Sequence, residues 1–111
     1  FGSQKGARAA KLRTADNKIF ATYYIGGGHF VDAKNHCDVT IHATYDDTLE
    51  KEAAIIEIGV GKGRVILSGP HIENDPELYR NTQDSFLQPL VAPLLANNEA
   101  RIEFLKTLLD L

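Results

Sequence analysis

The sequence predicts an α/β protein whose strands come first, in residues about 7–69, and whose helices follow, in residues about 75–109. Two observations support this order. Short runs that favour β-structure, separated by glycines and charged residues, fill the first part of the chain. Apolar residues recur at helical spacing only after residue 84. We therefore expect a sheet of short antiparallel strands, with helices packed against it.

Five segments are predicted to be strands. They are residues 7–13, 18–25, 38–45, 53–60 and 63–69. The first is rich in alanine, which favours strands only weakly. In the third, Val39, Ile41, Ala43 and Tyr45 alternate with polar residues, so we expect one buried face and a solvated His42 opposite it. The last two flank Gly61-Lys62 and predict a hairpin, and "GRVIL" in its second arm is typical of a buried strand.

The second part of the chain predicts helices. Asp75 precedes Pro76, a pairing typical of a helix start with Asp75 as its cap. Residues 84–95 have helical spacing, but two interior prolines predict a broken or short helix there. "NNEARIEFLKTLLDL" predicts an amphipathic helix capped by Asn97 or Asn98. Its predicted buried stripe consists of Ile102, Leu105, Leu108 and Leu109.

Length and charge narrow the classes of function. The 111 residues suffice for a single domain or a fragment of one, and a formal net charge of −3 gives no basic surface for nucleic acid. No apolar run approaches the ~18 residues of a membrane span, and "FGSQKGARAAKLR" has no signal peptide's apolar stretch. With one cysteine, Cys37, a reducing cytoplasmic location is expected. The chain begins with Phe1, and we expect it to be a fragment.

His71 and Glu73 are the first candidate site. They lie two residues apart where the last predicted strand ends, so in extended chain both side chains point to the same side and Ile72 points to the other. Glu73 can then reach the His71 ring, fix its tautomer and stabilise the imidazolium. This arrangement suits a general base with its orienting acid, and it also suits an ordinary surface pair.

Gly26, Gly27 and Gly28 are the second candidate. Their amides could bind an anion or an oxyanion, and the alternative is a tight turn after the strand. Cys37 lacks the G-x-C-x-G elbow of a nucleophile, so we interpret it as an incidental thiol. The "GVGKGR" run departs from the phosphate-loop pattern, and the four histidines have no recognised metal-ligand spacing. We therefore expect neither a metal nor a cofactor.

Two long motifs extend these observations. "YYIGGGHFVDA" and "GVGKGRVILSGPHIE", with "GARAAKL" and "DVTIHATYDD" before and between them, resemble the later part of the N-terminal domain of eukaryotic-type biotin protein ligases. The match runs from about Gly6 to Glu73, and "RIEFLKTLL" fits the closing helix. That domain is similar to class I glutamine amidotransferases. The resemblance thus implies a flavodoxin-like sheet flanked by helices, with additional antiparallel strands, of which this chain is the C-terminal portion.

The resemblance also implies a role for the first candidate site. His71 and Glu73 align with the histidine and acid of the amidotransferase triad, although Ile72 stands where the family usually has proline. The cysteine of the triad would lie upstream of Phe1, and Cys37 does not match it. The partners implied are the upstream segment of the same domain and the ligase catalytic domain, which adenylates biotin. The glycine-rich biotinyl-adenylate loop of that domain has no counterpart in this chain.

Two hypotheses follow from the resemblance. The first is a non-catalytic or regulatory amidotransferase-like module of a biotin protein ligase-type protein. The alternative is part of an active class I amidotransferase or amidohydrolase, whose cysteine nucleophile lies upstream of this chain. In the alternative, His71 would take the proton from the thiol and Glu73 would hold the ring.

Overall fold

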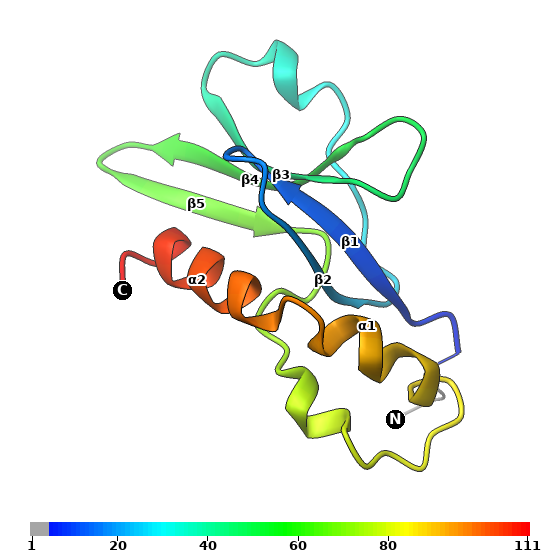
Figure 1. Cartoon of the computed structure of the whole chain (residues 1–111). Helices are drawn as coiled ribbons and strands as arrows, with labels where there is room; N and C mark the ends of the chain where they lie inside the picture. Colours follow the sequence, from blue (N-terminus) through cyan, green and yellow to red (C-terminus); the bar gives the residue numbers. More distant parts are fainter. Residues whose placement is uncertain (1–4) are drawn as a thin grey trace.

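The computed structural model describes residues 5–111, in which five strands form one antiparallel sheet and helices follow them (Figure 1). The sheet order is β2-β1-β3-β4-β5. The strands are β1 (Arg8–Thr14), β2 (Ile19–Tyr24), β3 (Val39–Tyr45), β4 (Ala53–Val60) and β5 (Gly63–Ser68). The 3-10 helices are η1 (Ala33–Asn35), η2 (Pro76–Tyr79) and η3 (Gln88–Leu90), and the α-helices are α1 (Val91–Leu95) and α2 (Asn98–Leu108). The predicted succession of strands and helices is confirmed.

Every strand pairing in the described part of the chain is antiparallel, including the predicted hairpin of β4 and β5. The parallel strands that a flavodoxin-like sheet implies are not among these five. The sheet is curled, because the segment that follows β5 returns to the outer edge of β2. There Tyr23 and His71 form a β-bridge in which the His71 amide donates to the Tyr23 carbonyl at 2.8 Å.

Helix α2 packs against one face of the curled sheet and closes the largest core cluster. Its inward side chains are Ala100, Phe104, Leu105 and Leu108, which meet Leu12, Phe20 and Ile55 of the strands. The predicted stripe is therefore partly wrong: Ile102 is 36% exposed and Leu109 is 51% exposed. Arg101, which was not predicted to be buried, lies on the inward side of the helix and is only 4% exposed. The inward face of the helix thus includes Arg101, whose guanidinium donates hydrogen bonds to the Ile72 carbonyl and to Oδ1 of Asn98.

A β-bulge interrupts the predicted alternation in β3. The register shifts between Ile41 and Ala43, so Val39 and Ile41 belong to one core cluster while Ala43 and Tyr45 belong to the cluster under α2. A bulge turns consecutive side chains to the same side of a strand, which a pattern of period two does not anticipate. The expectation of one buried face along the whole strand is wrong for this reason.

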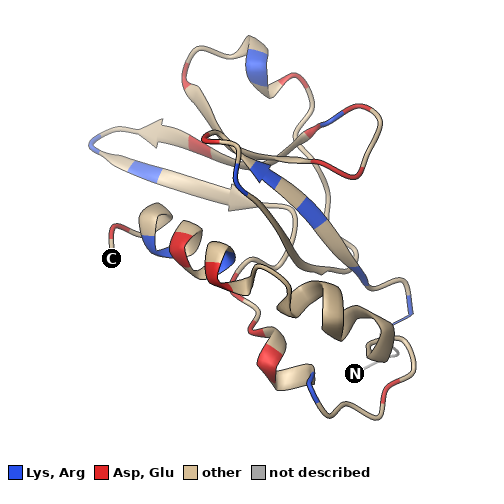
Figure 2. Cartoon of the chain, viewed as in Figure 1, with Lys and Arg blue, Asp and Glu red and all other residues tan. Residues whose placement is uncertain are grey.

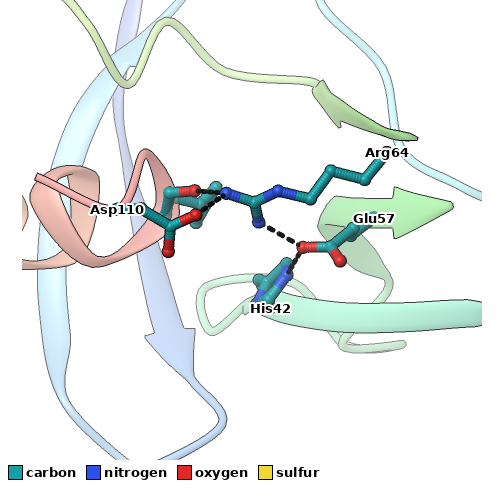
Figure 3. Close-up of polar contacts among 5 residues, drawn as sticks. His42, Glu57, Arg64 and Asp110 are labelled. Carbon is teal, nitrogen blue, oxygen red and sulfur yellow. Dashed lines mark hydrogen bonds and ion pairs between the residues drawn. The ribbon is translucent and has the colours of Figure 1, made fainter. Parts of the chain in front are cut away.

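The bulge also changes the surroundings of His42, which is not simply solvated as expected. Its Nε2 lies 3.0 Å from Oε1 of Glu57, which also accepts from Arg64 at 2.8 Å (Figure 3). These hydrogen bonds, from His42 first and Arg64 second, lower the pKa of the Glu57 carboxyl. Arg64 further donates to the Leu108 carbonyl and to Asp110, and so ties β5 to the end of α2.

Strand β5 is largely exposed, which contradicts the expectation of a buried strand. Val65 and Leu67 are 40% and 41% exposed, and Val60 at the end of β4 is 59% exposed. The strand lies at the edge of the sheet, where β4 is its only strand partner among the described residues. An apolar run alone cannot distinguish a central strand from such an edge, because it reports only the nature of the side chains.

The helix boundaries mostly follow the predicted signals. Asp75 caps η2, its Oδ1 accepting from the Glu77 amide at 3.0 Å, with Pro76 at the first position. The predicted broken helix is the pair η3 and α1, which pack with Tyr23 in a second cluster. Asn97 precedes α2, but its side chain makes no cap and instead donates to the Ile19 carbonyl.

Basic and acidic residues are mixed on α2 and along the strands and loops (Figure 2).

Candidate functional site

His71 and Glu73 lie in the segment that leaves β5, and their side chains are joined. Nδ1 of His71 and Oε1 of Glu73 are 3.1 Å apart, while Ile72 between them is buried in the core. The expected geometry, with the two polar groups on one side and Ile72 on the other, is therefore present. The backbone of His71 is fixed by Tyr23 at its amide and by the Thr22 hydroxyl, which donates to its carbonyl at 3.0 Å.

This geometry determines what the imidazole can do. An ionised carboxylate only accepts hydrogen bonds, so Nδ1 of His71 donates to Glu73 and Nε2 is the basic nitrogen of the neutral ring. The side chains of His71 and Glu73 are 47% and 67% exposed, so water has access to both. The pair is thus a histidine with an orienting acid and a free basic nitrogen at the surface.

The glycine loop lies directly against the segment that carries His71. A Cβ atom built on Gly27 would stand 2.1 Å from the Gly69 carbonyl oxygen, and one on Gly69 would stand 2.0 Å from the Gly28 oxygen. Only glycine allows two backbones to approach this closely. The two long sequence motifs, which are about 40 residues apart along the chain, therefore meet in space.

Two tyrosines hold this contact in place. The Tyr24 hydroxyl donates to the Gly27 carbonyl at 2.8 Å, and the Tyr45 hydroxyl donates to the Gly28 carbonyl at 2.6 Å. Burial is the main reason why the pKa of Tyr45 is raised to about 12. The loop thus has its carbonyls bound, whereas the amides of residues 26–28 donate no hydrogen bond within the described residues. Anion binding by these amides stays a prediction.

Arg101 binds the backbone between His71 and Glu73, and the sequence did not predict this role. Its Nη1 donates to the Ile72 carbonyl at 2.7 Å, and its Nε donates to Oδ1 of Asn98 at 2.8 Å. Desolvation lowers the pKa of the guanidinium, an effect that nearby Asp75 and Glu73 oppose. The helical spacing indicates that Arg101 shares the inward face, because it lies three, four and seven residues before Phe104, Leu105 and Leu108. An arginine at such a position is usually assigned to the surface.

Cys37 lies away from the histidine. It is exposed and lies two residues before the start of β3. Val39, the first residue of β3, pairs with Ile58 near the β4–β5 turn. His71 follows the opposite end of β5. Within residues 5–111 the ring of His71 bonds only to Glu73, so the structure brings together the histidine, the acid and the glycine loop without a nucleophile.

Within residues 5–111, a metal site would require clustered ligands, and a membrane-spanning segment would require a long apolar helix. No group of three or more histidine, cysteine, aspartate or glutamate side chains is arranged to hold a metal ion. None of the helices has both the length and the apolar character required to cross a membrane.

Comparison with known proteins identifies the family. The family model for the N-terminal region of biotin-protein ligase matches residues 1–111. A biotin–protein ligase of Schizosaccharomyces pombe is 46% identical over 82 residues, which cover 69% of this chain and 13% of the ligase. An uncharacterized protein of Chlamydia muridarum is 35% identical over 105 residues, which cover 93% of this chain and 39% of that protein. No solved structure matches significantly. The chain therefore belongs to the biotin-protein ligase N-terminal family.

Proposed function

We propose that this chain is a non-catalytic or regulatory module of a biotin protein ligase-type protein, similar in fold to class I glutamine amidotransferases. The observation that carries the proposal is the site itself. His71 and Glu73 have the spacing and the hydrogen bond of a triad's base and acid, and no thiol or hydroxyl among the described residues is bonded to the ring. A histidine without a nucleophile can bind or orient a group but cannot complete covalent catalysis.

The proposed partners are the upstream segment of the same domain and the ligase catalytic domain of the same polypeptide. The support is the edge of the sheet at β5. Val60, Val65 and Leu67 are exposed there beside the outer edge of β5, which pairs with no further strand of residues 5–111. An exposed apolar edge strand readily pairs with a further strand. The chain also spans only part of its relatives. The matched residues make up 39% of the Chlamydia muridarum protein and 13% of the Schizosaccharomyces pombe ligase.

The absence of catalysis can be tested directly. The purified chain and its His71→Ala variant should both give no release of ammonia from glutamine or from simple amides. Turnover by the wild-type chain that disappears in His71→Ala would contradict the proposal. The regulatory role needs a second measurement in the full-length protein, where removal of residues 5–111 should change the rate of biotin transfer to its acceptor. An unchanged rate would contradict a regulatory role.

The alternative function is an active amidotransferase with an upstream cysteine, and one observation favours it. The glycine loop, whose amides donate no hydrogen bond in the described structure, lies beside the His71 segment, where an oxyanion would need donors. Treating the full-length protein with an electrophilic glutamine analogue separates the two functions. Covalent labelling of an upstream cysteine that requires His71 supports the alternative, and no labelling supports the non-catalytic module.

A further inference from the structure

A hollow lies apart from His71, between the loop that follows the glycines and the loop that joins β3 to β4. Its volume is about 390 Å³. The two loops meet at a β-bridge between Phe30 and Ala53, in which the Phe30 amide donates to the Ala53 carbonyl at 3.0 Å. This volume falls within the range of pockets that bind small molecules. Neither the triad-like pair nor the sheet edge at β5 contributes to the lining.

The floor of the hollow is apolar and rigidly placed. Phe30, Ala33, Ile41 and Ala53 line it, and all four belong to the core cluster on the face of the sheet away from α2. Ala33 and Ala53 are each 6% exposed. A ligand with an apolar body would therefore cover side chains that are already packed in this core cluster, and the floor itself would need little rearrangement.

The rim carries charges of both signs that form no ion pair with another residue of the described part of the chain. Asp32 and Lys34 lie on the first loop and Glu50 on the second. None of these three side chains forms an ion pair or hydrogen bond with another described residue. In contrast, Lys51 on the same rim is bonded to Asp46. Asp32 and Lys34 do not pair even with each other, so a cationic and two anionic groups remain available around an apolar floor.

We propose that this hollow binds a small zwitterion with an apolar body, the chemical class of the aliphatic α-amino acids. Lys34 would bind the carboxylate of the ligand, and Glu50 or Asp32 would bind its ammonium group. A ligand carrying only an anionic group would face three rim carboxylates, those of Asp32, Glu50 and Glu52, against two lysines. Charge-assisted hydrogen bonds are the stronger ones, and a zwitterion satisfies both signs at once. The ligand would also bridge the two loops.

This inference deepens the proposed function by naming the class of small molecule that the module would sense, but its test is independent of His71. The probe is L-leucine, titrated into the chain while the backbone amide NMR signals are followed. We expect saturable shifts that are largest in residues 29–34 and 50–53, which line the hollow. Two further probes each remove one charge: isovalerate lacks the amine and isoamylamine lacks the carboxylate. Each should bind at least roughly tenfold more weakly, since each loses a charged hydrogen bond.

Lys34→Glu should abolish the shifts, and Lys62→Glu is the matched control. Lys62 lies in the exposed turn between β4 and β5, outside the hollow, and the substitution makes the same change of charge. The proposal is overturned if leucine causes no shift at millimolar concentration, if isovalerate binds as well as leucine, or if Lys34→Glu binds like Lys62→Glu. His71→Ala should leave leucine binding unchanged, so a failure here is distinct from a failure of the proposed function.

Discussion

The contact between the two glycine-containing segments predicts a severe and local effect of a single methyl group. In Gly27→Ala the new Cβ would stand 2.1 Å from the Gly69 carbonyl oxygen, and in Gly69→Ala it would stand 2.0 Å from the Gly28 oxygen. An ordinary van der Waals contact of a Cβ atom is 3.4–4 Å long, so the backbones must separate by more than about 1 Å. Overpacking of this kind costs about 1–3 kcal/mol.

The separation would also weaken the tyrosine hydrogen bonds that hold the loop. The bonds of Tyr24 and Tyr45 to the Gly27 and Gly28 carbonyls contribute about 1 kcal/mol each. We therefore expect Gly27→Ala and Gly69→Ala each to lower the free energy of unfolding by about 2–4 kcal/mol, which corresponds to a melting temperature lower by roughly 10 °C or more. Urea unfolding followed by circular dichroism measures the change.

Gly28→Ala is the matched control from the same loop. A Cβ at Gly28 meets nothing within 4 Å, and the residue does not have a positive φ. This substitution should change stability by less than about 1 kcal/mol, and it can stabilise by restricting the unfolded chain. If Gly27→Ala and Gly69→Ala are as stable as Gly28→Ala, the close approach of the two segments is wrong.

Three further predictions concern single side chains. Arg101→Leu should lower the free energy of unfolding by about 2–4 kcal/mol, because it leaves the buried Ile72 carbonyl without its donor; Arg101→Lys, in the same urea assay, should recover part of the loss. The raised pKa of Tyr45, about 12, means that the neutral phenol stabilises the fold fully below pH ~10 and that this contribution is lost as the pH rises through ~12. Wild type should therefore lose about 2 kcal/mol more than Tyr45→Phe over that interval, and equal losses would refute the assignment. Arg64→Ala should cost about 1 kcal/mol and accelerate hydrogen exchange in the last turn of α2, since the Leu108 carbonyl loses a donor; unchanged exchange there would contradict the anchoring role.

The parts of the fold that depend on local chemistry could be predicted from the sequence. The turn at Gly61 and Lys62, the cap at Asp75 and the short helical segments η3 and α1 around Pro89 and Pro93 are each determined by a few neighbouring residues. The His71–Glu73 contact belongs to the same class, because it follows from the alternation of side chains along extended chain. These features do not depend on how the rest of the molecule packs.

The errors arose where distant segments decide the outcome. The bulge near His42 and the inward position of Arg101 on α2 depend on partners in other strands and loops, namely Glu57 and the Ile72 carbonyl. The exposure of β5 depends on which strand lies beside it, and Val65 and Leu67 have the same side chains at an edge as in a sheet centre. Glu57 and Ile72 each lie more than ten residues away from their partners along the chain, so hydrophobic periodicity, which compares nearby residues, could not identify them.

The meeting of Gly27 with Gly69 gives the two candidate sites a common structural basis. Gly69 is two residues before His71, and Gly28 is immediately before His29, which lines the hollow. A displacement of the loop after the glycines would have to move Gly28. Gly28 and Gly69 are in close contact, so Gly69 and the His71 segment would have to move as well. A ligand that draws the two loops of the hollow together would therefore act on the geometry of His71 and Glu73 without touching either residue.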